Sequence, residues 1–170
     1  MFFDRDGIVN QIPTTRYVEQ PQDFKILPEF LDALRVVCAR GYAAVIVTNQ
    51  KGIATGQIKP AALQEMHRSL METVCHQNLR LLDIRVNTAT DDAHPDRKPN
   101  PGLLLGAAQE HGLDLHRSWM VGDQARDMEA GHRAGCRTIF VGPRVPAVAD
   151  FHVSDMSALV EFLRQHLDVG

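Results

Sequence analysis

The sequence has few of the features that mark secreted or membrane-spanning proteins. It contains three cysteines in 170 residues, Cys38, Cys75 and Cys136, which are far apart and odd in number. We interpret them as buried free thiols rather than as a disulfide framework, which suits a reducing cytoplasm. No apolar run approaches the length of a membrane-spanning helix, and the first residues lack the basic and apolar regions of a signal peptide. We therefore expect a cytoplasmic protein without a membrane partner.

Positive charge is also in short supply. Lysine and arginine number 18 against 21 aspartates and glutamates, for a formal net charge of −3. Such a balance gives no general attraction for nucleic acid, because a polyanion would need a local basic site. We expect a small-molecule partner, no nucleic acid, and a monomer or small homo-oligomer.

Strand and helix patterns alternate along the whole chain. We predict strands at residues 1–3, 42–47, 83–87, 118–122, 137–142 and near 151–153, and helices at 28–41, 60–78, 101–112, 125–135 and 156–167. Alternation of this kind predicts βαβ units, hence an α/β fold with a mainly parallel central sheet between helix layers. The chain is expected to form a single domain over residues 1–170, a Rossmann-like three-layer sandwich. The connections leave no room for a large cap.

Polar side chains follow three of the predicted strands. Ligands in open parallel sheets bind beyond the carboxyl ends of the strands, so we take these residues as site candidates. They are Asp4 and Asp6 after the first strand, Thr48, Asn49 and Gln50 after the second, and Asp123 after the strand at 118–122, with Asp127 four residues later and Arg97 and Lys98 ahead of the helix at 101.

The chemistry of these residues is mutually consistent. Asp4, Asp6 and Asp123 would bring several carboxylates together, which is unfavourable unless a cation or protons neutralise them. Oxygen ligands without histidine or cysteine suit Mg²⁺. Thr48 and Lys98 would add donors for a phosphoryl group. Of the two aspartates two residues apart, one can attack phosphorus and the other can protonate the leaving oxygen. The set predicts a phosphate ester beside Mg²⁺.

Four short motifs, "DRDG", "TNQ", "RKPNPG" and "GDQARD", resemble in the right order those of the haloacid-dehalogenase superfamily of phosphatases, over residues 2–142. Their combination is similar to the branch that holds D-glycero-D-manno-heptose 1,7-bisphosphate phosphatase and histidinol-phosphate phosphatase. The resemblance implies that Asp4 is the nucleophile and Asp6 the general acid/base. It further implies phosphoryl contacts from Thr48 and Lys98, a substrate contact from Arg97, Mg²⁺ held by Asp4, the backbone carbonyl of Asp6 and Asp123, and a supporting role for Asp127.

The chain departs from this branch just before "RKP". Relatives carry a loop of cysteines and a histidine that binds structural zinc, whereas this chain has "NTATDDAHPD", with His94 and no cysteine. One histidine cannot replace the thiolates of such a site, so we predict no zinc. In relatives the same loop helps to shape the substrate pocket. In this chain it carries three acids, Asp91, Asp92 and Asp96.

The sequence thus indicates a Mg²⁺-dependent phosphomonoester hydrolase that acts through an aspartyl-phosphate on a small phosphorylated metabolite, with a heptose 1,7-bisphosphate first. The alternatives are a histidinol-phosphate phosphatase, a polynucleotide 3′-phosphatase, or a non-catalytic phosphate-binding descendant. Asn49 and Gln50 are candidate substrate contacts, or else they only close the turn after their strand. Asp127 is alternatively a first-turn helix acid. Arg16 and Tyr17, in the loop after the first motif, are further candidates for meeting the substrate.

Overall fold

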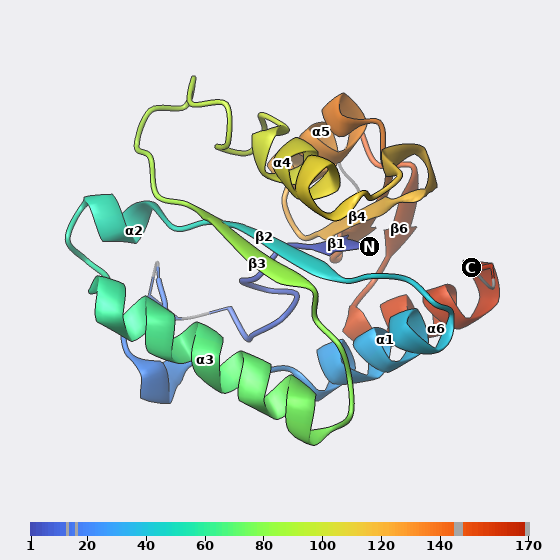
Figure 1. Cartoon of the computed structure of the whole chain (residues 1–170), viewed down its shortest axis with the longest axis horizontal. Helices are drawn as coiled ribbons and strands as arrows, with labels where there is room; N and C mark the ends of the chain where they lie inside the picture. Colours follow the sequence, from blue (N-terminus) through green and yellow to red (C-terminus); the bar gives the residue numbers. More distant parts are fainter. Residues whose placement is uncertain (13, 16, 145–147, 169–170) are drawn as a thin grey trace.

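A sheet of six parallel strands forms the centre of the computed structural model, which describes residues 1–12, 14–15, 17–144 and 148–168. Arg16, a candidate from the sequence, lies outside these residues. The strands stand in the order β3-β2-β1-β4-β5-β6 (Figure 1). Their bounds are Phe2–Phe3 (β1), Val45–Asn49 (β2), Asp83–Asn87 (β3), Trp119–Gly122 (β4), Arg137–Val141 (β5) and Phe151–Val153 (β6).

Helices cover both faces of this sheet. Helices α4 (Gly102–His111) and α5 (Ala125–Ala134) lie on one face, and α1 (Pro28–Ala39), α3 (Pro60–His76) and α6 (Met156–His166) lie on the other (Figure 1). Short turns of helix occur at α2 (Lys51–Ala54), η1 (Pro21–Asp23) and η2 (Leu115–Arg117). The predicted α/β sandwich is confirmed, and the sheet is wholly parallel in the described residues.

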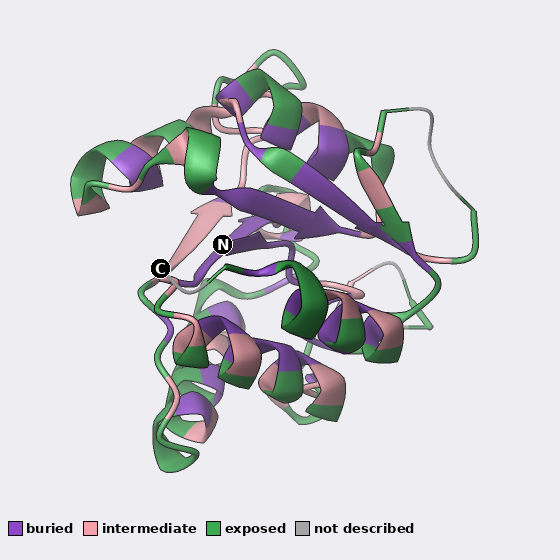
Figure 2. Ribbon diagram, turned by 90° about the vertical axis from the view of Figure 1, so that its right-hand side faces the viewer, coloured by how far each residue is buried: buried purple, intermediate pink, exposed green. Residues whose placement is uncertain are grey.

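The two cores follow from the period-two alternation of the strands. Phe3, Ile46 and Val121 pack toward α1, α3 and α6, whereas Phe2 and Val45 pack toward α4 and α5. Figure 2 shows the central strands buried and the helices buried only on their inward faces. No helix in the described ranges combines the length and the apolar character that crossing a bilayer requires.

Strand β1 is only two residues long, yet it occupies the middle of the sheet. Phe2 and Phe3 are fully buried, one on each face, and the ring of Phe3 meets that of Phe30 edge to face at 5.5 Å. The backbone amide of Asp4 then donates to the carbonyl of Val121 at 2.9 Å. Asp4 is thereby fixed at the carboxyl end of a strand held on both sides.

Two sequence predictions need correction. The second strand begins at Val45 rather than at residue 42, because Gly41 adopts φ +78° and the amide of Tyr42 still donates to the carbonyl of Val37 at the end of α1. The prediction of buried thiols is confirmed for Cys136 and is wrong for Cys75, which is exposed on α3 one residue beyond the buried face that ends with Val74, while Cys38 is only half-buried.

Candidate active site

Three carboxylates meet at the carboxyl edge of the sheet. Asp4 follows β1, Asp123 follows β4 and Asp127 lies in the first turn of α5, and each offers an oxygen within 4.8 Å of the others. The Oδ1 atom of Asp123 is buried and has no hydrogen-bond partner in the part of the chain that the structure describes. A cluster of acidic oxygens with an unsatisfied member and no nitrogen or sulfur donor fits Mg²⁺.

Gly7 makes room for this cluster. Its φ of +89° lies in the left-handed region, and a Cβ atom there would stand 2.4 Å from Oδ2 of Asp123. A side chain at this position would displace the Asp123 carboxylate. The glycine of the "DRDG" motif is therefore required both by the turn after β1 and by the close approach of Asp123.

Lys98 joins two of the three carboxylates. Its ammonium group lies 2.7 Å from Oδ1 of Asp4 and 2.7 Å from Oδ1 of Asp127, and it donates to the carbonyl of Val47 at 2.8 Å. Burial lowers the pKa of Lys98, but the charges of Asp127 and Asp4 outweigh it and raise the pKa above its ordinary value. Lys98 therefore stays charged at the base of the site.

Asp4 and Asp123 are hard to ionise at the same time in the metal-free chain. Burial, followed by the charge of Asp127, raises the pKa of Asp4 to about 7 even though Lys98 opposes the shift. Burial, again followed by Asp127, raises the pKa of Asp123 to about 6. A bound cation would reverse both shifts, because it favours the charged forms.

Asp6 is held apart from this cluster by a cage of donors. Arg5 donates to both of its oxygens through Nη2, at 2.9 and 3.1 Å, and the side-chain amides of Asn10 and Gln50 donate at 3.0 and 2.9 Å. Burial raises the pKa of Asp6, but the charge of Arg5 and these hydrogen bonds outweigh it and hold the pKa below its usual value. The free chain thus carries Asp6 as an oriented carboxylate.

Arg5 is itself buried and fixed. Its guanidinium is fully inaccessible to solvent, lies over the ring of Phe24 at 5.5 Å, and contacts Nε2 of His67 on α3 at 3.4 Å. Burial and then the charge of Arg5 lower the pKa of His67 to about 4. Arg5 is not among the candidates from the sequence, although an arginine between two aspartates was a signal that it pairs with one of them.

The second polar stretch divides into two kinds of residue. Thr48 and Asn49 line the cavity above Asp4, and the Asn49 side chain also bonds to both the amide and the carbonyl of Lys98. Gln50 does not fit its predicted role as a substrate contact, because it is fully buried and its amide donates to Asp6 and to Thr48. It orients the groups that line the cavity.

Arg97 also lies differently from the expectation. Its side chain is 11% exposed, its Nε donates to Oδ1 of Asp92 at 2.7 Å and its Nη1 to the carbonyl of Ala89 at 3.1 Å. These contacts turn it toward the loop at residues 88–96 rather than into the cavity above Asp4. A substrate contact would require Arg97 to leave Asp92.

Asp127 has more contacts than a first-turn helix acid needs. It is fully buried and accepts from the backbone amide of Gln124 at 3.1 Å, which caps α5, while its other oxygen faces Lys98. The helix-acid alternative is therefore only part of its role. Asp127 couples the start of α5 to the lysine beneath the site.

The loop at residues 88–96 is closed by hydrogen bonds. Nδ1 of His94 lies 3.1 Å from the side-chain nitrogen of Asn87 and accepts from the amide of Asp96, and the Asn100 side chain donates to the carbonyls of Asp92 and His94. The histidine that the sequence left without cysteine partners is thus part of a polar network that shapes the loop.

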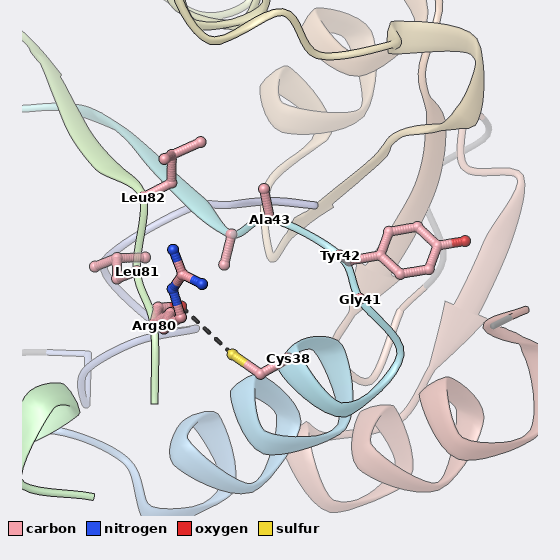
Figure 3. A pocket seen from close by; sticks show the side chains of 8 residues that line it. Cys38, Gly41, Tyr42, Ala43, Arg80, Leu81 and Leu82 are labelled. Atoms are coloured by element: carbon pink, nitrogen blue, oxygen red, sulfur yellow. Dashed lines mark hydrogen bonds between the residues drawn. The ribbon is translucent and has the colours of Figure 1, made fainter. Parts of the chain in front are cut away.

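The cavity above Asp4 has a volume of about 230 Å³. Its walls include Asp4, Asp6 and Asp123, and its rim carries Tyr17 and Arg126. A larger cavity of about 330 Å³, lined by Cys38, Tyr42 and Arg80 among others, lies where β2 and β3 begin, at the opposite edge of the sheet (Figure 3). It contains none of the acids, so the chemistry belongs to the smaller cavity.

The chain is similar to known phosphatases. Residues 96–150 match the HAD-hydrolase-like family model. The chain is 31% identical over 191 aligned residues to a D-glycero-D-manno-heptose-1,7-bisphosphate 7-phosphatase of Thermosynechococcus vestitus. The alignment covers 98% of this chain and 96% of that protein. The chain belongs to the haloacid-dehalogenase-like hydrolases. It is a phosphatase of that family.

Other members of the family agree. A D-glycero-beta-D-manno-heptose-1,7-bisphosphate 7-phosphatase of Mesorhizobium japonicum is 36% identical over 79% of this chain, which spans 65% of that relative's length. The solved structure of a D,D-heptose 1,7-bisphosphate phosphatase from B. bronchiseptica, complexed with magnesium and phosphate, has a TM-score of 0.85 at 29% identity and covers 97% of both chains. The haloacid-dehalogenase fold is therefore retained over nearly the whole chain.

Proposed function

We propose that this chain is a Mg²⁺-dependent phosphatase that hydrolyses a small sugar bisphosphate, of the D-glycero-D-manno-heptose 1,7-bisphosphate type, through an aspartyl-phosphate on Asp4. One observation carries the proposal. Asp4 is buried, lies 2.7 Å from the buried Lys98 and shares a carboxylate cluster with Asp123. Two residues later comes Asp6, whose carboxylate is surrounded by hydrogen-bond donors. The names of the relatives support the substrate class.

In the first step an oxygen of Asp4 attacks the phosphorus, and the bond from phosphorus to the leaving oxygen breaks. The ammonium of Lys98 and the hydroxyl of Thr48 bind phosphoryl oxygens as their charge develops. Mg²⁺, held by Asp4, Asp123 and the backbone carbonyl of Asp6, would neutralise the charge on the non-bridging oxygens. The leaving oxygen takes its proton from Asp6.

In the second step Asp6 removes a proton from water, which attacks phosphorus and breaks the bond to Asp4. Phosphate leaves, Asp4 is free again, and Asp6 again holds a proton in place of the one that it donated in the first step. Arg5 favours the charged form of Asp6, which suits the base of this step. For the first step, the negative charge of the bound ester raises the pKa of Asp6 and supplies the protonated form.

The test is phosphate release with Mg²⁺ from heptose 1,7-bisphosphate, histidinol phosphate and a 3′-phosphorylated oligonucleotide. We expect the heptose bisphosphate to give the highest kcat/KM, and we expect chelation of the metal to abolish turnover. A higher kcat/KM for histidinol phosphate or for the oligonucleotide would replace the proposed substrate. If a folded chain that binds Mg²⁺ releases phosphate from none of the three, the result would favour the alternative of a non-catalytic phosphate-binding descendant.

A further inference from the structure

A bisphosphate substrate brings a second anionic group that the catalytic residues leave without a partner. The cavity walls hold three carboxylates, Asp4, Asp6 and Asp123, which repel a second phosphate. The cations near its base are already engaged: Lys98 with Asp4 and Asp127, and Arg5 with Asp6. The distal phosphate must therefore find a cation farther out.

The position of Asp6 decides on which side of Asp123 the distal part of the substrate lies. Two cavities share Ile12 and Asp123. The cavity of about 230 Å³ also contains Asp4 and Asp6, whereas the neighbouring cavity of about 390 Å³, with Arg144 in its lining, contains neither. Since the leaving oxygen must reach Asp6 to be protonated, the sugar and its second phosphate extend into the smaller cavity and across its rim.

Arg126 is the one cationic side chain that lines this smaller cavity among the described residues. It is the second residue of α5 and is exposed, and within the described part of the chain it makes no hydrogen bond or ion pair. By contrast, Arg97 is paired with Asp92. A planar guanidinium with five free donors matches the oxygens of a phosphate group.

We propose that Arg126 binds the distal phosphate of the substrate and so sets a preference for bisphosphates over monophosphates. This inference rests on the proposed function. It assigns to Arg126 a role in specificity, separate from the transfer of the phosphoryl group at Asp4.

The experiment compares two substrates that differ only in the distal group, heptose 1,7-bisphosphate and heptose 7-phosphate, in the presence of Mg²⁺. The measured quantity is the ratio of kcat/KM for the bisphosphate to that for the monophosphate. Loss of charged hydrogen bonds to one phosphate is expected to lower this ratio by about 10- to 100-fold in Arg126→Gln. Arg126→Lys keeps the charge but not the paired donors of the guanidinium, and we expect it to lower the ratio by less than Arg126→Gln does.

Arg144→Gln is the matched control, because Arg144 is also exposed and unpaired in the described chain but lines the neighbouring cavity. Its ratio is expected to equal that of the wild type. The inference is overturned if Arg126→Gln keeps the wild-type ratio or if Arg144→Gln lowers it instead. If the wild type hydrolyses neither heptose phosphate, the proposed function fails and this inference fails with it. If the wild type hydrolyses both and Arg126→Gln leaves the ratio of kcat/KM values unchanged, the inference alone is overturned.

Discussion

At the scale of single residues, the site depends on how each carboxylate is surrounded. Asp4 and Asp123 are buried beside Asp127, which raises both pKa values, whereas Asp6 is surrounded by donors, which lower its pKa. Two aspartates of one short motif, Asp4 and Asp6, therefore have different proton affinities. In the metal-free chain these affinities are the reverse of what a nucleophile and a general acid need, so the proposed roles require a bound cation beside Asp4 and a bound ester beside Asp6.

Magnesium binding should release protons in a narrow pH window. Asp4, with a pKa of about 7, and Asp123, with a pKa of about 6, are partly protonated near pH 6, and a cation binds only their charged forms. Because the free chain binds these protons and the metal-bound chain does not, Mg²⁺ affinity rises with pH from 6 to 8 and then levels off. Calorimetry in buffers of different ionisation enthalpy measures the released protons. Equal Mg²⁺ affinity at pH 6 and pH 8 would contradict the described burial of these acids.

Arg5 is expected to position Asp6 for proton transfer. Arg5→Lys keeps the buried charge but loses the paired bonds to Asp6. We expect kcat/KM, which depends only on the steps up to release of the leaving group, to fall by about tenfold or more for an alkyl phosphate, whose leaving oxygen needs a proton, and to change little for 4-nitrophenyl phosphate. An equal loss on both substrates would indicate a general structural effect of Arg5 instead. Thermal unfolding of the variant supplies the control for folding.

At the scale of elements, the short strand β1 is held by its side chains more than by its length. Phe3→Ala removes a ring that is fully buried against Phe30 and is expected to cost about 3–5 kcal/mol of unfolding free energy. Phe3→Leu keeps most of the volume and is expected to cost under about 1.5 kcal/mol. Denaturant unfolding measures both. Similar values for the two variants would mean that the ring does not anchor the strand.

The loop at residues 88–96 is expected to keep its shape without zinc. His94 already uses Nδ1 within the loop, and removing it in His94→Ala is expected to lower Tm by about 2–4 °C, as expected for a loss of about 1 kcal/mol. A zinc chelator is expected to leave Tm unchanged, and elemental analysis to find zinc well below one atom per chain. Stoichiometric zinc, or a Tm that falls with the chelator, would overturn this prediction.

Sequence patterns were most informative about elements and motifs. The order of strands and helices followed from hydrophobic alternation, and the strand ends carried Asp4, Thr48 and Asp123 to one edge. Pattern could not show which polar residues face the substrate: Gln50 and Thr48 are neighbours in the same motif, yet Gln50 is turned toward Asp6. Such partners depend on contacts between distant segments, as between Arg5 and His67.

At the scale of the whole molecule, the parallel sheet explains why four separated motifs form one site. All six strands run in the same direction, so the segments after β1, β2 and β4 meet at one edge, and the loop before α4 closes the site with Lys98. A relative of known structure at 29% identity retains this fold over 97% of the chain. Arg126, at the start of α5, lines the cavity at this edge.

The central claim is that Asp4 carries the phosphoryl group during turnover. The most direct measurement is to quench the Mg²⁺-loaded chain in acid during hydrolysis of heptose 1,7-bisphosphate and to analyse its peptides by mass spectrometry, with Asp4→Asn in parallel. The account predicts a phosphoryl group on Asp4, reducible by borohydride to homoserine, and no turnover in the variant. Full turnover by Asp4→Asn, or a phosphoryl group on another residue, would contradict it.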